Sequence, residues 1–167
     1  MKNLVQKRYQ PKAQMGKISD LMRRPQVWYE SPMKCPCGSN KEYAACCGLF
    51  HSGEAQAPTA EQLMRSRYAA FVKNDMTYLQ ETTDPQTLTS IDEEANREWA
   101  EHAQFKKLEI LSAEEKGTKG IVEFKAHYAL DGEDYIHHEI STFRKQAGQW
   151  FFKSGKIKEE KPEKAKS

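Results

Sequence analysis

The spacing of apolar positions changes near residue 106. Between residues 60 and 105, apolar side chains recur every three or four positions, the period of an amphipathic helix. Three helices are predicted, over residues 60–73, 75–82 and 90–105. Farther along, apolar and polar positions alternate as in half-buried strands. Four strands are predicted, over residues 108–112, 121–129, 135–144 and 149–153. Helices followed by an antiparallel sheet indicate the α+β class.

Polar residues mark the expected ends of these elements. Thr59-Ala-Glu-Gln62 and Ser90-Ile-Asp-Glu93 both have the form of a capping box, which opens a helix. Asp84-Pro85 ends the second helix, because proline disfavours helical backbone at the residue before it. Turn signals separate the four strands and consist of Gly117, Asp131-Gly132 and Gly148.

All four cysteines lie in one segment of thirteen residues, Cys35-Pro-Cys-Gly-Ser-Asn-Lys-Glu-Tyr-Ala-Ala-Cys-Cys47. Disulfide frameworks tie distant parts of a chain together, whereas clustered thiolates suit one tetrahedral metal ion. Pro36 stiffens the first pair, and Lys41 offsets the negative charge of four thiolates. Two alternatives stay open at this point: His51 as a substitute ligand, and a redox disulfide between the first two cysteines.

The same segment, Cys-Pro-Cys-Gly-Ser-Asn-Lys-Glu-Tyr followed by Cys-Cys-Gly, resembles the SEC-C motif. That motif is named for the C-terminal tail of the SecA translocation ATPase. In the family it binds zinc, or iron, and contacts the chaperone SecB and ribosomes. The resemblance implies that the metal is Zn²⁺, with iron as the alternative, and that the partner is a protein or the ribosome. The implied ligands are Cys35, Cys37, Cys46 and Cys47.

The body of the chain resembles the YchJ family from Cys35 to about Gly155. The resemblance rests on Leu63-Met-Arg-Ser-Arg-Tyr-Ala-Ala-Phe71, on Glu139-x-Ser-x-Phe143 and on Gly148-Gln-Trp150. It implies a nuclear transport factor 2-like (NTF2-like) cone, in which helices pack on a curved antiparallel sheet and enclose a pocket. Some members carry a second SEC-C motif at the C-terminus, where this chain has a Lys-rich tail.

Four segments follow from these patterns. They are a basic, partly disordered N-terminal extension (1–32), the SEC-C motif (33–52), the NTF2-like domain (58–155) and a disordered Lys-rich tail (156–167).

A candidate pocket follows from the strand alternation. Tyr135, His137, Glu139, Ser141 and Phe143 share one face of their strand. If this face lines the cone, Arg67, His137 and Glu139 meet there, with Tyr68 and Trp99 nearby. A His–Glu pair can act as a general base, and an arginine can bind an anionic substrate. The competing interpretation is a structural Arg67–Glu139 ion pair beneath aromatic side chains. Glu123, Lys125 and His127 are expected on a solvated or dimer-facing surface.

The net charge of +2 hides an uneven distribution. The first 34 residues carry +6, residues 35–152 carry −7 and the last fifteen carry +3. The basic N-terminal arm is therefore a candidate nucleic-acid contact. Its cations are Lys2, Lys7, Arg8, Arg23 and Arg24, and Tyr9, Trp28 and Tyr29 are available for stacking.

No apolar run approaches the roughly 18 residues that span a bilayer, and the first residues lack a secretory pattern, so a cytoplasmic location is expected. Gly-rich phosphate loops and nucleophile elbows are missing from the sequence. The leading hypothesis is a non-enzymatic adapter that contacts a protein or ribosomal partner, with a homodimer through the sheet as a further possibility. The first alternative is a small-molecule binder or enzyme that uses the pocket, and the second is nucleic-acid binding through residues 1–34.

Overall fold

The computed structural model describes residues 33–159 of the 167-residue chain. The predictions for the basic N-terminal extension and for the end of the Lys-rich tail lie outside these residues. The helical elements are η1 (Tyr43–Ala45), α1 (Cys47–His51), α2 (Ala60–Val72), α3 (Met76–Glu81), η2 (Leu88–Ser90) and α4 (Glu93–His102). The strands are β1 (Gln104–Lys116), β2 (Lys119–Leu130), β3 (Glu133–Gln146) and β4 (Gln149–Ile157).

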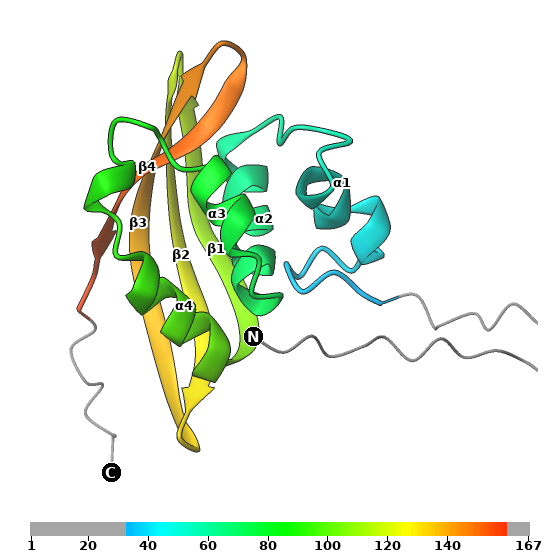
Figure 1. Ribbon diagram of the computed structural model, residues 1–167, viewed down its shortest axis with the longest axis vertical. Helices are drawn as coiled ribbons and strands as arrows, with labels where there is room; N and C mark the ends of the chain where they lie inside the picture. Colours follow the sequence, from blue (N-terminus) through cyan, green and yellow to red (C-terminus); the bar gives the residue numbers. More distant parts are fainter. Residues whose placement is uncertain (1–32, 160–167) are drawn as a thin grey trace, which may run out of the picture. The chain divides into compact units, whose positions relative to one another are not determined.

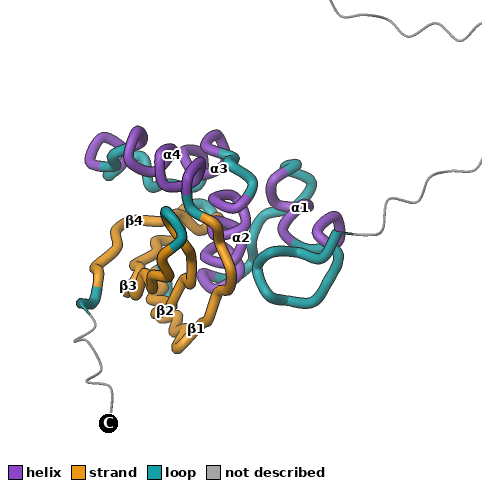
Figure 2. Tube along the Cα trace, turned by 90° about the horizontal axis from the view of Figure 1, so that it is seen from below, coloured by secondary structure: helices purple, strands orange, loops and turns teal. Residues whose placement is uncertain are grey.

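The four strands form one antiparallel sheet in the order β1-β2-β3-β4. The β2–β3 turn uses Asp131 and Gly132, both with positive φ, as a two-residue hairpin requires. Helices α2, α3 and α4 cover one face of this sheet (Figure 1). The segment that carries α1 lies on the far side of α2 from the sheet (Figures 1 and 2). The predicted α+β class, with helices packed on one antiparallel sheet, is confirmed.

The main core lies between α2 and the sheet. Leu63 of α2 packs there with Val122, Phe143 and Trp150, and all four are almost completely buried. Gly120 brings helix and sheet close together, because a Cβ at this position would lie 2.5 Å from the Cβ of Ala60. The first turn of α2 therefore rests directly on β2.

The first two helices were predicted closely. Thr59 caps α2 as expected, and its side chain accepts a hydrogen bond from the Gln62 N–H at 3.1 Å. Asp75 caps α3 and accepts from the Tyr78 N–H at 3.0 Å. Both caps satisfy backbone donors that have no partner inside the helix.

The prediction for the third helix was wrong at both ends. Asp92, not Ser90, caps α4, and its side chain accepts from the Ala95 N–H at 3.0 Å. The helix ends at His102, and Phe105 belongs to β1, where it pairs with Tyr128. Pairing with β2 therefore overrides the helical spacing that extends to Phe105.

All four strands are longer than predicted; β1 is extended the most, and β4 extends into the predicted tail. β1 begins at Gln104 and continues to Lys116, and its register with β2 is irregular at two places. β4 continues to Ile157, so that Lys156 and Ile157, assigned to the tail, pair with β3. Neither extension contains the regular alternation that reveals a half-buried strand, because the added residues are mostly exposed.

Candidate metal centre and cavity

The cysteine knuckle, residues 33–52, brings all four cysteines to one point. The sulfur atoms of Cys35, Cys37, Cys46 and Cys47 lie within 4.8 Å of one another. The Sγ atoms of Cys37 and Cys46 are 3.7 Å apart. A tetrahedral zinc site with Zn–S bonds of about 2.3 Å has sulfurs about 3.8 Å apart, so the arrangement fits such an ion. All four are free thiols, and the alternative disulfide between the first pair is not formed.

Burial and mutual hydrogen bonds change the pKa of three of the sulfurs, those of Cys35, Cys37 and Cys47. A hydrogen bond from Cys47 lowers the pKa of Cys37 to about 4. That shared hydrogen bond, followed by burial, raises the pKa of Cys47. Burial raises the pKa of Cys35, although the backbone N–H groups of Cys37 and Cys47 donate to its sulfur. Cys37 thus ionises most readily, and its hydrogen bond to Cys47 keeps that neighbour protonated; a bound metal ion would stabilise further thiolates beside it.

His51 joins the knuckle to α2 and is not placed as a ligand. Its Nε2 lies 2.8 Å from the Ser66 carbonyl oxygen, and its Nδ1 lies 2.8 Å from the Tyr43 hydroxyl. A carbonyl only accepts, so Nε2 carries the proton and Nδ1 accepts from Tyr43. Burial lowers the pKa of His51 and favours this neutral form. With both ring nitrogens in use, the alternative of His51 as a metal ligand is not supported.

Two basic side chains also attach the knuckle to α2. Arg65 Nη1 donates to the Cys37 carbonyl at 2.9 Å, and Lys73 Nζ lies 4.3 Å from the centre of the Tyr43 ring. Sequence reasoning assigned the positive charge near the cysteines to Lys41, which is exposed. It missed Arg65, for which the only signal was its place one turn after Glu61, its ion-pair partner.

The cavity predicted from the strand alternation, called the main cavity below, lies on the opposite side of α2, between that helix, α4 and the sheet. Its volume is about 420 Å³. The five predicted pocket residues all line it: Arg67, Tyr68, Trp99, His137 and Glu139. Of the five β3 residues that the alternation puts on one face, His137, Glu139 and Ser141 line the cavity.

Glu139 is the centre of a polar network in the cavity wall. Its Oε2 lies 2.7 Å from His137 Nε2, and its Oε1 accepts from the Ser141 hydroxyl at 2.6 Å. Burial raises the pKa of Glu139, but these hydrogen bonds and the charge of Arg67 outweigh burial and lower the pKa below its usual value. Gly155 makes the room, since a Cβ there would lie 2.1 Å from Glu139 Oε1.

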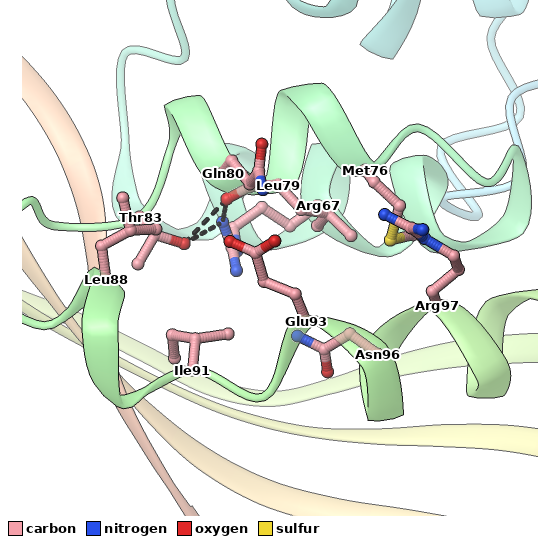
Figure 3. A pocket seen from close by; sticks show the side chains of 10 residues that line it. All are labelled: Arg67, Met76, Leu79, Gln80, Thr83, Leu88, Ile91, Glu93, Asn96 and Arg97. Atoms are coloured by element: carbon pink, nitrogen blue, oxygen red, sulfur yellow. Dashed lines mark hydrogen bonds between the residues drawn. The ribbon is translucent and has the colours of Figure 1, made fainter.

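Arg67 is held by the end of α3 instead of by Glu139. Its Nη1 donates to the Leu79 carbonyl at 2.8 Å, to the Thr82 hydroxyl at 2.7 Å and to the Thr83 hydroxyl at 3.3 Å. Figure 3 shows two of these hydrogen bonds, from the guanidinium to Leu79 and to Thr83. Among residues 33–159, no ion pair within 4.0 Å joins it to Glu139, although the charges of the two side chains attract each other. Burial lowers the pKa of Arg67 to about 10, and it stays charged at neutral pH.

The opposite face of the sheet carries charged pairs. His127 Nε2 lies 2.7 Å from Glu109, and Glu123 contacts His138 at 2.8 Å and Lys158 at 2.7 Å. These pairs are consistent with the solvated surface expected for Glu123 and His127. A homodimer through this face stays a prediction.

Comparison with known proteins decides the family. The description "YchJ, middle NTF2-like domain" matches residues 59–155, and the SEC-C motif matches residues 34–49. The chain belongs to the YchJ family. The two matches coincide with the domain that holds the cavity and with the cysteine knuckle.

Relatives from several bacteria support this placement of the YchJ-family chain. A UPF0225 protein of Geobacter sulfurreducens is 43% identical over 124 residues, which cover 72% of this chain and 77% of that protein. A UPF0225 protein of Haemophilus influenzae is 42% identical over 119 residues, with 71% and 74% covered.

Two solved structures are similar to this chain. A SEC-C motif containing protein from Rhodopseudomonas palustris has a TM-score of 0.71 and 43% identity, covering 76% of this chain and all of that one. A sec-c motif containing protein from Psychrobacter arcticus has a TM-score of 0.66 and 29% identity, and the match covers 79% of this chain and 86% of that one.

Among the helices of residues 33–159, none is long and apolar enough to cross a bilayer.

Proposed function

We propose that this YchJ-family protein is a zinc-binding, non-enzymatic adapter of the cytoplasm, in which the cysteine knuckle contacts a protein or ribosomal partner. The observation that supports metal binding is the cluster of four sulfur atoms, which lie within 4.8 Å of one another. Four thiolates suit zinc, and iron is the alternative that metal analysis must separate from it.

The shape of the knuckle supports a role in contact. Its outer surface carries exposed residues of mixed character, namely Lys34, Asn40, Lys41, Glu42, Ala44 and Ala45. A metal ion fixes such a short segment without a large core, so these side chains are presented in one arrangement. The partner class rests on the resemblance to the SecA tail, whose motif contacts SecB and ribosomes.

Metal analysis of the full-length chain tests the first half of the proposal. We expect about one zinc per chain by mass spectrometry of the metals, and loss of that zinc in Cys46→Ser/Cys47→Ser. Protein purified without zinc, with four thiols fully reactive in the folded state, contradicts zinc binding. One iron per chain would support the four-cysteine metal centre but identify its metal as iron.

Partner capture tests the second half without removing the metal. Lys41→Glu/Ala45→Arg alters the exposed surface of the knuckle and keeps all four cysteines, and Lys116→Glu on the β1–β2 hairpin is the matched control. We expect the control and the wild type to co-sediment with ribosomes or to retain a defined protein, and the knuckle variant to lose it while still holding zinc. Equal retention by all three excludes the knuckle as the contact.

A further inference from the structure

The main cavity has walls that suit a ring. Six aromatic side chains line it: Tyr68, Phe71, Trp99, Phe124, Tyr128 and Phe152. A cavity of roughly 150 Å³ holds benzene, so one of about 420 Å³ has room for one or two rings with a substituent. Apolar walls with a few polar groups at one place are typical of small-molecule sites.

The polar group that distinguishes this cavity is the Arg67 guanidinium. The side chain lies in the wall that separates the main cavity from a water-sized space between α3 and α4. The residue is only 6% exposed. Its guanidinium stacks on the Phe152 ring, with Cζ 4.5 Å from the ring centre. A buried charge in this position is costly unless its donors are used.

Only one of the three guanidinium nitrogens has protein partners. Nη1 makes all the hydrogen bonds of Arg67, to acceptors at the end of α3. Nε and Nη2 have no hydrogen-bond partner within residues 33–159. These two nitrogens form the edge of arginine that presents parallel N–H groups, which matches the two oxygens of a carboxylate.

The neighbouring acids do not occupy this edge. Glu139 directs both carboxylate oxygens to Ser141 and His137. Glu93 of α4 points toward Arg67 (Figure 3), but its side chain is exposed and forms no ion pair with Arg67. The guanidinium thus keeps its charge and two aligned donors next to an aromatic cavity.

We propose that the main cavity binds a small aromatic carboxylate, with the carboxylate paired to the Nε–Nη2 edge of Arg67 and the ring held among the aromatic side chains. This site is separate from the cysteine knuckle, and its ligand requires neither the adapter role nor a partner. Arg67 provides charge and orientation, and the walls provide apolar burial.

Matched ligand pairs test the charge requirement. The probes are benzoate, cinnamate and 2-naphthoate, each beside its primary amide, titrated into the zinc-loaded full chain by calorimetry and by saturation-transfer NMR. We expect at least one acid to bind about tenfold or more tightly than its amide, because only the carboxylate fits the charged two-donor edge. If no acid binds more tightly than its amide, the proposal is wrong.

Two arginine substitutions on α2 locate the effect. Arg67→Lys keeps the positive charge and removes the two-donor edge, and it should abolish most of the preference of acid over amide. Arg65→Lys makes the same change on the knuckle side of the helix and should leave ligand binding unchanged. Equal binding by wild type and Arg67→Lys overturns the proposal. The zinc content of each variant shows that the chain is folded at the knuckle, and circular dichroism reports the sheet.

Discussion

The cysteine knuckle and the NTF2-like domain both bury polar side chains, but they differ in what surrounds these side chains. The knuckle buries three of its four cysteine side chains against Ala69 and has almost no other core. The NTF2-like domain buries Arg67 and Asp84, and its own chain supplies acceptors for Arg67 Nη1 and the Arg144 partner of Asp84. From this difference we expect the knuckle to need a bound ion for its structure, and the sheet and helices to fold without one.

Metal removal should separate the two regions most strongly. After chelation, or in Cys46→Ser/Cys47→Ser, we expect amide exchange in residues 34–51 to accelerate by about 100-fold or more, because structural metal sites couple binding to folding. Strands β2 and β3 should keep their protection. Hydrogen exchange with mass spectrometry measures both at once. Equal loss of protection in the sheet would mean that the two regions fold as one unit.

A core truncation should produce the reverse pattern. Phe143 is completely buried, and Phe143→Ala should lower the free energy of unfolding by about 3–5 kcal/mol. Zinc content should stay at the wild-type level, because Phe143 lies in the sheet core. Urea denaturation measures the loss, and Leu111→Ala, at a site 49% exposed, should cost less than about 1 kcal/mol. Loss of zinc from folded Phe143→Ala would show that the knuckle is not independent of the sheet core.

A substitution at the contact between the knuckle and α2 should have a smaller effect on stability. His51→Ala removes the hydrogen bonds to Tyr43 and Ser66 and should weaken attachment of the knuckle to α2 by about 1–3 kcal/mol. Hydrogen exchange in residues 43–51 measures it on zinc-loaded protein. His102→Ala, at an exposed site on α4, is the control and should leave the knuckle unchanged. Unaltered exchange in His51→Ala would show that the other contacts suffice.

The smallest expected effect is the change in stability with pH that comes from Glu139. The pKa of Glu139 is lowered in the folded state, so its ionised form stabilises the protein above the usual value near 4.5, and this contribution is lost as the pH falls below that value. The stability difference between wild type and Glu139→Gln should therefore shrink between pH 6 and pH 3.5. Acid weakens thiolate–metal bonds equally in both proteins, and the difference isolates Glu139. A difference that is constant with pH contradicts the lowered pKa.

Much of the site could be predicted because period and spacing determine which side chains share a face. The alternation of β3 placed His137 and Glu139 together, and the period of α2 added Arg67 and Tyr68. The clustering of cysteines in thirteen residues indicated the sulfur cluster directly.

The parts that were missed depend on irregular segments. Two of the three acceptors for Arg67 are the hydroxyls of Thr82 and Thr83, beyond the end of α3, where no period applies. Ser90 and Asp92 are both good caps, and the preceding 3₁₀ turn, which sequence spacing does not reveal, decides between them. Gly155 could have been noticed, because glycine within a strand often marks a close approach of another group.

Helix α2 belongs to both regions at once. Arg65 and Ser66 contact the knuckle, while Arg67 and Tyr68 line the cavity. Ala69 is completely buried against the cysteines. Successive residues thus face different neighbours, and a substitution at any of them removes a contact on one side or the other. We therefore expect residues 63–71 to diverge little among related chains, whereas exposed strand positions such as Leu111 have fewer contacts to preserve.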